Sequence, residues 1–431
     1  MFADGNGNNP ILPINYFIPD VEAHVWGDGR IYLYGSFDIK GKSDYCSKLY
    51  HVFSSSDLIN WVDHGESFHS DNPNSDVPWS NQNLYAPDVA FKDGKYYLYF
   101  CLSDGSEGVA SSVFPYGPFK NALKIDVIDG IDPGVFVDDD GQAYIYWGQF
   151  DKVRAAKLKA NMTEIDESTI VQPLSVVEHN FHEGSSMRKR NGIYYYVYAD
   201  TSRRDDRPTC LGYATSASPL GPFNYKGVII DNYGCDPAVW NNHGSIEEFN
   251  SKWYVFYHRS TCGGVFSRRV CAEPITFNED GTIPEVEMTS QGVGKPINAF
   301  SRIEASVACL LRGKVRIEDC NEDGEKLCSI ENGDYAVYKY IDFKMGARSF
   351  MVNVSSGTSG GYIEIRIDNI TGPIVGVCEV PSTGGWNNYS SLNCAINTVI
   401  GVHVLYLRFI GEAIGKLFNV NFFKFIDSSN V

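Results

Sequence analysis

A short aromatic segment recurs five times in the first two thirds of this chain. Each copy starts at a small turn residue and continues as alternating aromatic and aliphatic residues, a pattern typical of β-strands. The central tyrosines are spaced by 65, 47, 51 and 59 residues, and they are Tyr32, Tyr97, Tyr144, Tyr195 and Tyr254. Repeats of about 50 residues that each form a small antiparallel sheet are typical of a β-propeller. The sequence therefore predicts an all-β fold that begins with a five-bladed propeller.

The repeat ends near residue 295, at the glycine-containing stretch 291–296. Beyond it, residues 300–431 contain short alternating runs such as 362–368 and 402–409. About 130 residues of this kind fit a β-sandwich of the jelly-roll type. We therefore expect two domains, a propeller over residues 1–295 and a β-sandwich over residues 300–431.

Charge and cysteine content limit the partners and the compartment. The formal net charge of −17 argues against nucleic acid and anionic membranes as partners. The first residues show neither a basic region nor an apolar core of a leader peptide, and no apolar run is long enough to span a membrane. Eleven cysteines without a C-x-x-C pair favour a reducing compartment. We expect a cytoplasmic protein, with secretion still open if a leader precedes this sequence.

Three carboxylates, Asp20, Asp132 and Glu183, occupy one position of the repeat, 12 residues before the central tyrosine. The innermost strands of a propeller line its central channel, so we expect the three acids to converge at one mouth. Their mutual repulsion should raise at least one pKa enough to keep that acid protonated at neutral pH. Glycoside hydrolysis by inversion uses such a pair, a protonated acid as the proton donor and an ionised acid as the base. Each acid alone could be a turn residue, as Asp132 before a proline suggests, but the shared register favours a common site.

Other residues are weaker candidates. His243 lies 11 residues before Tyr254 and could hold a cation, or it could be a buried histidine without a ligand. Asp88 lies nine residues before Tyr97, where substrate contact and a strand-edge role are both open. The aromatic residues that could stack on sugar rings are Phe37, Trp79 and Tyr85, although most aromatic residues of so tyrosine-rich a chain belong to the core.

These segments resemble the motifs of glycoside hydrolase family 43, whose members are five-bladed propellers that cleave arabinose- and xylose-containing glycans with inversion. The matching stretches are residues 9–13, 18–20, 85–89, 130–134, 182–184 and 243–245. They follow the family's order across the whole predicted propeller. By this resemblance Asp20 is the general base, Glu183 the general acid, and Asp132 the residue that tunes and orients the acid.

The resemblance implies further roles around these acids. His243 corresponds to the ligand of a calcium or sodium ion on the propeller axis, and no organic cofactor is implied. Arg268 is a candidate for holding a substrate hydroxyl, and Arg269 could take that place. Glu22 departs from the commoner pattern after the base, so it could add a contact at the pocket floor and leaves the sugar preference open.

The C-terminal part resembles a family 6 carbohydrate-binding module, through residues 333–335, 363–368, 371–374, 380–386 and 405–409. Trp386 and Asn419 match two positions of the sugar cleft of such modules, but Ser329 stands where a second stacking aromatic is usual. The module's structural calcium site is also weakened, because Glu304 remains while Ser306 and Asn421 replace acids. We therefore expect a packing partner for the propeller rather than a strong glycan binder.

The expected function is an exo-acting, inverting glycosidase that removes terminal α-L-arabinofuranosyl or β-D-xylosyl units from xylan-derived oligosaccharides. An inverting enzyme needs its two carboxyl groups about 6.5–9.5 Å apart to leave room for water. Three alternatives stay open at this point: an endo-arabinanase, an exo-galactanase, and a sugar-binding propeller without catalytic activity.

Overall fold

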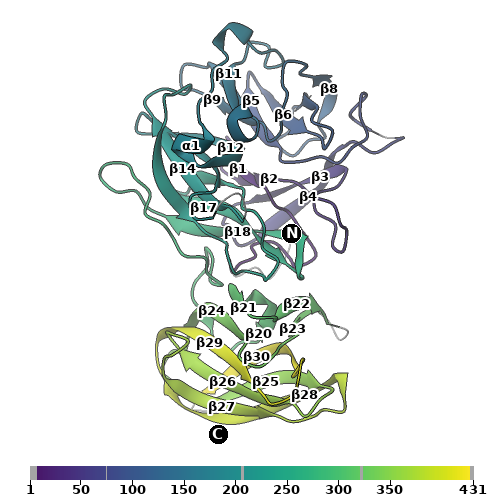
Figure 1. Cartoon of the computed structure of the whole chain (residues 1–431). Helices are drawn as coiled ribbons and strands as arrows, with labels where there is room; N and C mark the ends of the chain where they lie inside the picture. Colours follow the sequence, from purple (N-terminus) through teal and green to yellow (C-terminus); the bar gives the residue numbers. More distant parts are fainter. Residues whose placement is uncertain (1–6, 74, 205–207, 321–323, 428–431) are drawn as a thin grey trace.

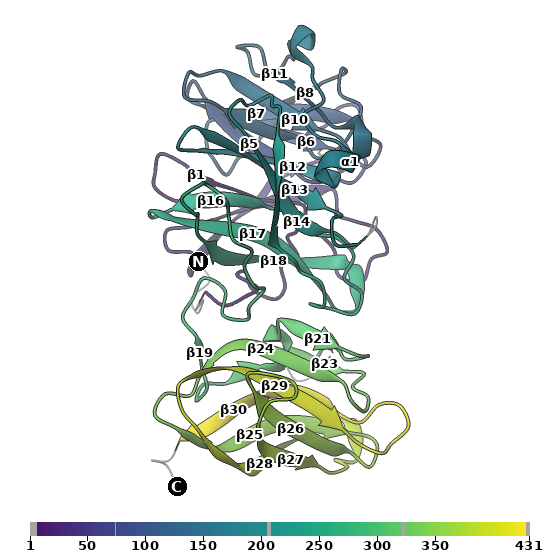
Figure 2. The same ribbon diagram turned by 60° about the vertical axis from the view of Figure 1, so that its left-hand side comes forward.

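The computed structural model describes residues 7–73, 75–204, 208–320 and 324–427. Two bodies lie one above the other, a propeller formed by the first part of the chain and a β-sandwich formed by the last (Figures 1 and 2). No helix in these ranges is long and apolar enough to cross a membrane.

Five small antiparallel sheets form the blades of the propeller, which confirms the predicted fold. The strands of blades one and two are β1 (Glu22–Val25), β2 (Ile31–Tyr34), β3 (Leu49–Ser55), β4 (Trp61–His69), β5 (Asp88–Lys92), β6 (Lys95–Cys101), β7 (Glu107–Ser112) and β8 (Lys120–Lys124). Those of blades three to five are β9 (Gly134–Val137), β10 (Ala143–Trp147), β11 (Arg154–Lys157), β12 (Phe181–Arg190), β13 (Ile193–Asp200), β14 (Cys210–Ser216), β15 (Asn224–Ile230), β16 (Ser245–Phe249), β17 (Lys252–Thr261) and β18 (Gly264–Ile275). The short helices between them are η1 (Phe150–Lys152), η2 (Glu167–Thr169) and α1 (Val176–His179).

The repeated aromatic segments are the second strands of the five blades. They form because their alternating side chains pack between neighbouring blades, where Tyr99 and Tyr146 are fully buried. The hairpins before them use residues that tolerate a positive φ. Asp93 and Gly94, with φ of 51° and 79°, join β5 to β6 in the two-residue turn that matches strand twist.

The five inner strands β1, β5, β9, β12 and β16 contact one another in a closed ring around the channel. Blade five is joined to blade one by a buried side chain. The hydroxyl of Ser245 on β16 donates to the carbonyl of Val21 at 2.9 Å and accepts from the amide of Ala23 at 3.1 Å. The ring therefore brings residues near the inner strands of all five blades to one axis.

The second domain is a curled β-sandwich around one apolar core. Its elements are β19 (Ile297–Asn298), β20 (Ile303–Glu304), η3 (Ala305–Val307), β21 (Leu310–Arg312), β22 (Arg316–Asp319), β23 (Glu325–Cys328), β24 (Tyr335–Asp342), β25 (Ala347–Ser356), β26 (Gly361–Ile367), β27 (Ile374–Val380), β28 (Gly385–Val399), β29 (Val402–Ile410) and β30 (Asn419–Asp427). The strand order is β19-β24-β29-β26-β27-β28-β25-β30-β23-β22. The step from β27 to β28 joins the two faces of the sandwich.

The two domains share a polar, partly buried contact. Arg269 on β18 reaches across to Glu325 on β23, and its two terminal nitrogens lie 2.9 and 2.8 Å from the carboxylate oxygens. The amide of Leu311 donates to the carbonyl of Gly234 at 2.8 Å, which adds a backbone link between the domains. The C-terminal module therefore packs on the propeller through specific contacts.

Candidate active site

A pocket at one mouth of the channel contains the three acids that share a register. Its lining residues are Asp20, Tyr45, Cys46, Tyr85, Ala86, Ile131, Asp132, Gln149, Glu183, Asn241, His243 and Arg268. Glu183 lies on inner strand β12, while Asp20 and Asp132 lie two residues before β1 and β9. Both aspartates adopt a positive φ, 56° and 59°, which is uncommon for non-glycine residues and is often found at functional sites. Equal spacing in the sequence thus delivers the carboxylates to one place.

The environment of Asp20 favours its ionised form. The guanidinium of Arg268 donates to Asp20 Oδ1 at 2.9 Å, and the hydroxyl of Ser36 donates to Oδ2 at 2.8 Å. Burial raises the pKa of Asp20, but the charge of Arg268, followed by the neighbouring rings of His258 and His243 and the hydrogen bond from Ser36, outweighs burial and holds the pKa below its usual range. Asp20 is therefore a carboxylate at neutral pH, as a general base must be.

Asp132 has the opposite electrostatic setting. Burial, followed by the charges of Glu183 and Asp20, raises its pKa well above the usual range, although the nearby backbone amide of Gly184 opposes the rise. This setting favours the protonated form of Asp132. The expected rise of one pKa in the trio is therefore found at Asp132.

Glu183 is held by a neighbour that the sequence did not reveal. The side-chain amide of Gln149 donates to Glu183 Oε2 at 2.5 Å, and His182 Nε2 lies 3.8 Å from the same oxygen. Gln149 follows the second strand of blade three, β10, which runs back toward the mouth where β9 begins. The signal for Gln149 in the sequence is its position just after a second strand, which ends at the same mouth of the channel.

Arg268, rather than Arg269, lines the pocket. Its Nε and Nη2 donate to the two carboxylate oxygens of Asp38 at 2.9 and 3.0 Å, which fixes the guanidinium beside Asp20. The guanidinium also lies 4.8 Å from the ring centre of Tyr45, another lining residue. Arg269 points to the second domain, so of the two arginines Arg268 is the one placed to meet a substrate.

Four other predicted substrate contacts separate into two groups. Tyr85 lines the pocket, whereas Phe37, Trp79 and Asp88 are not among the lining residues of the described chain. Phe37 packs against His51 with ring centres 5.0 Å apart, and Trp79 stacks on Phe100 at 6.0 Å. These two aromatic side chains pack within the blades, so they do not line the sugar site as expected from the sequence.

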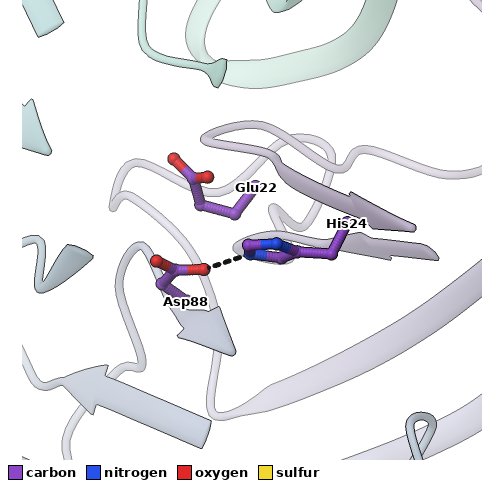
Figure 3. A group of neighbouring side chains, drawn as sticks. All are labelled: Glu22, His24 and Asp88. Atoms are coloured by element: carbon purple, nitrogen blue, oxygen red, sulfur yellow. Dashed lines mark hydrogen bonds and ion pairs between the residues drawn. The ribbon is translucent and has the colours of Figure 1, made fainter. Parts of the chain in front are cut away.

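Asp88 and Glu22 instead face the channel, together with His24 (Figure 3). Ligand atoms from the three side chains lie within 4.8 Å of one another, and His24 Nε2 is 2.6 Å from Asp88 Oδ1. Glu22 Oε2 accepts from Arg188 at 3.1 Å, while its buried Oε1 has no hydrogen-bond partner among the described residues. Glu22 is not among the described residues that line the pocket, so the expected contact at the pocket floor is not found. Two carboxylates and an imidazole could instead hold a divalent cation.

His243 lines the pocket close to two of the three acids. Its Nδ1 is 3.8 Å from Asp20 Oδ1 and 3.9 Å from Asp132 Oδ2, and its ring packs against Gly184, where an added Cβ would come within 3.0 Å. Burial lowers the pKa of His243 despite the surrounding carboxylates, so the ring is neutral and one nitrogen lone pair is available to a cation.

The predicted sugar cleft of the second domain has only one of the two aromatic rings that would stack on a sugar. Trp386 is 36% exposed and could stack, whereas Ser329 is buried and offers no ring. The amide of Asn419 donates to the carbonyl of Trp386 and to the hydroxyl of Ser355, both at 3.1 Å. The amide nitrogen that would meet a sugar is thus already engaged within the fold.

The family model for glycosyl hydrolases family 43 matches residues 8–283, and that for the family 6 carbohydrate-binding module matches residues 311–427. An arabinoxylan arabinofuranohydrolase of Bacillus subtilis is 32% identical over 94% of this chain and 92% of its own length. A xylosidase/arabinosidase of Thermoclostridium stercorarium is 31% identical over 95% and 97%.

Solved structures agree with these relatives. A family 43 arabinoxylan arabinofuranohydrolase from Bacillus subtilis, in complex with cellotetraose, has a TM-score of 0.56 at 31% identity and covers 98% of this chain and 99% of its own. A β-xylosidase/α-arabinofuranosidase from a compost metagenome, bound to xylotriose in a calcium-free form, has a TM-score of 0.57 at 32% identity over 66% and 98%. Both domains of this chain are thus matched in order.

Proposed function

This chain belongs to glycoside hydrolase family 43, and from that membership we propose that it is an exo-acting, inverting glycosidase. Its proposed substrates are xylan-derived oligosaccharides, from which it releases terminal α-L-arabinofuranosyl or β-D-xylosyl units. The observation that carries the proposal is the convergence of Asp20, Asp132 and Glu183 in one pocket, each with a different electrostatic environment. The relatives named for arabinoxylan and xylosides support the substrate class.

The different environments of the three acids support a mechanism in which Asp20 accepts a proton and Glu183 donates one. Asp20, kept ionised by Arg268, accepts a proton from a water that attacks the anomeric carbon. Glu183, oriented by Gln149, gives a proton to the departing glycosidic oxygen. Asp132, whose raised pKa favours its protonated form, limits the negative charge around Glu183.

An axial cation, calcium or sodium, is part of the proposal. The buried Oε1 of Glu22 lacks a hydrogen-bond partner within the described chain, and Glu22, His24 and Asp88 offer ligand atoms that lie within 4.8 Å of one another. These three residues would hold the ion, with Arg188 already balancing part of their charge, while His243, the ligand predicted from the sequence, lies outside this group. Bound there, the ion supplies positive charge near the pocket that strengthens the ionised forms of nearby acids.

A reducing compartment is also proposed, because nine of the eleven cysteines are buried and none belongs to a C-x-x-C pair. A cytoplasmic site of action fits uptake of short oligosaccharides, which an exo-acting enzyme would shorten from one end.

The test combines a substrate panel with two site variants. The wild type should release pentose from aryl α-L-arabinofuranoside, aryl β-D-xyloside or arabinoxylan oligomers, with inverted configuration at the anomeric carbon seen by NMR. Glu183→Gln and Asp20→Asn should each lose roughly 10²–10⁴-fold in turnover on natural oligomers. Release from arabinan or galactan alone would favour the endo-arabinanase or exo-galactanase alternatives, and a folded wild type without any release would leave only a binding function.

A further inference from the structure

Two cysteines of the C-terminal sandwich face each other across neighbouring strands. Residues Gly376 on β27 and Ile396 on β28 are ladder partners in an antiparallel pair. Counting two residues along each strand from this pair places Cys378 directly opposite Cys394. Side chains two residues apart on a strand lie on the same face, so both thiols share one side of the sheet.

The side chains themselves agree with this register. Cys378 belongs to the buried core of the sandwich, and Cys394 packs against the same core. The interaction between the two neighbouring thiols raises the pKa of Cys378 and lowers the pKa of Cys394, while the Cys378 thiol also donates to the carbonyl of Glu379 at 3.9 Å. Both remain free thiols in this structure.

We propose that Cys378 and Cys394 are a modification site, a pair that closes into a disulfide across the junction of the two faces of the sandwich. Opposed residues of antiparallel strands have Cα atoms about 4.5–5.5 Å apart, within the roughly 4.4–6.8 Å that a disulfide accepts. Rotation of the two side chains toward each other is enough to form the bond, and the backbone keeps its place.

The reaction partner is a small-molecule disulfide, such as oxidised glutathione. Cys394 is the half-buried member and attacks first as a thiolate, which forms a mixed disulfide and releases one small thiol. The Cys378 thiolate then attacks the Cys394 sulfur and releases the second small thiol. Overall the protein loses two protons and two electrons, and the small disulfide gains them as two thiols.

The position of the bond gives it a mechanical effect. Gly376 and Ile396 are the only ladder partners recorded between β27 and β28 in the described chain, so few backbone bonds hold this junction. The segment between the two cysteines also contains Trp386, the exposed aromatic of the predicted sugar cleft. A disulfide would close this segment into a loop and restrict it in the unfolded chain.

The test uses the full chain, incubated with excess oxidised or reduced glutathione. Oxidation should remove two titratable thiols and yield one cross-linked peptide pair joining Cys378 to Cys394. The thermal midpoint of the protein should rise on the order of 5–10 °C. Turnover of an aryl glycoside should stay unchanged, so failure here is separate from failure of the proposed activity.

Matched variants make the result decisive. Cys378→Ala and Cys394→Ala should each abolish the cross-linked peptide and the thermal shift, whereas Cys320→Ala, a buried thiol of the same domain, should retain both. If the wild type instead keeps all its thiols, or stops at a glutathione adduct on Cys394, the proposed site is wrong. Circular dichroism of each variant verifies folding before the thiols are counted.

Discussion

Arg268 is the residue on which the ionised state of Asp20 depends. Replacing it by Gln removes the nearest positive charge, while burial of Asp20 remains, so the pKa of Asp20 should rise. A general base works only when ionised, and the acidic limb of the kcat/KM profile should therefore move to higher pH. The measurement is a pH–rate profile on an aryl glycoside.

Arg269→Gln is the control, because it also removes a guanidinium group but at the neighbouring residue. Arg269 contacts Glu325 rather than the pocket, so its loss should leave the acidic limb in place even if stability falls. An acidic limb that stays unmoved in Arg268→Gln would contradict the assignment of Asp20 as the base.

Gln149 should act through Glu183, whose carboxylate oxygen it contacts at 2.5 Å. Gln149→Ala should lower kcat on arabinoxylan oligomers more than on aryl glycosides, because good leaving groups need less help from a general acid. The loss should be smaller than that of Glu183→Gln. Gln142→Ala is the control, because Gln142 binds only backbone carbonyls of blade three, at Ala143 and Leu158. Equal losses of kcat on arabinoxylan oligomers and on aryl glycosides would show that Gln149 only stabilises the fold and does not assist Glu183.

The difference between predicted and missed residues has a physical reason. Asp20, Asp132 and Glu183 were predictable because a repeat fixes equal positions on equal strands, and strand position fixes the channel mouth. Gln149 and Cys46 also line the pocket, but they lie in the connections after β10 and before β3, where the spacing varies from blade to blade. Aromatic residues gave the weakest signal, since the same rings serve the core and the sugar site.

The second strands of the blades are easier to recognise in the sequence than the inner strands, because the two are packed differently. A second strand is packed on both faces and reads as a continuous apolar and aromatic run, as in β6 and β10. Inner strand β1 has only four residues and carries the charged Glu22 and the polar His24, because its side chains face a polar channel. Its residues do alternate between polar and apolar, but four residues are the shortest run in which such alternation can be recognised, so the strand is easily missed.

Closure of the ring between β16 and β1 should depend on Ser245. Ser245→Ala leaves the carbonyl of Val21 and the amide of Ala23 without their partner in a fully buried place. Such a loss costs about 1–3 kcal/mol of the free energy of unfolding. The check is urea unfolding, with Ser111→Ala on β7, a strand outside the inner ring, as the control. Equal stability of the two variants would show that this link does not hold the ring closed.

At the scale of the whole molecule, one buried ion pair holds the two domains together. Arg269 and Glu325 have nearly fully buried side chains, and without Glu325 the guanidinium of Arg269 would be a buried charge with no carboxylate partner among the described residues, whereas Glu325 also lies 3.7 Å from Lys40. Glu325→Ala should therefore lower stability by about 3–5 kcal/mol. Because the chain has two domains, the loss should appear as separation of one thermal transition into two. The double variant Arg269→Ala with Glu325→Ala should recover part of the loss, since no lone buried charge remains. If the double variant is as unstable as the sum of the two single variants, the pair does not couple the domains.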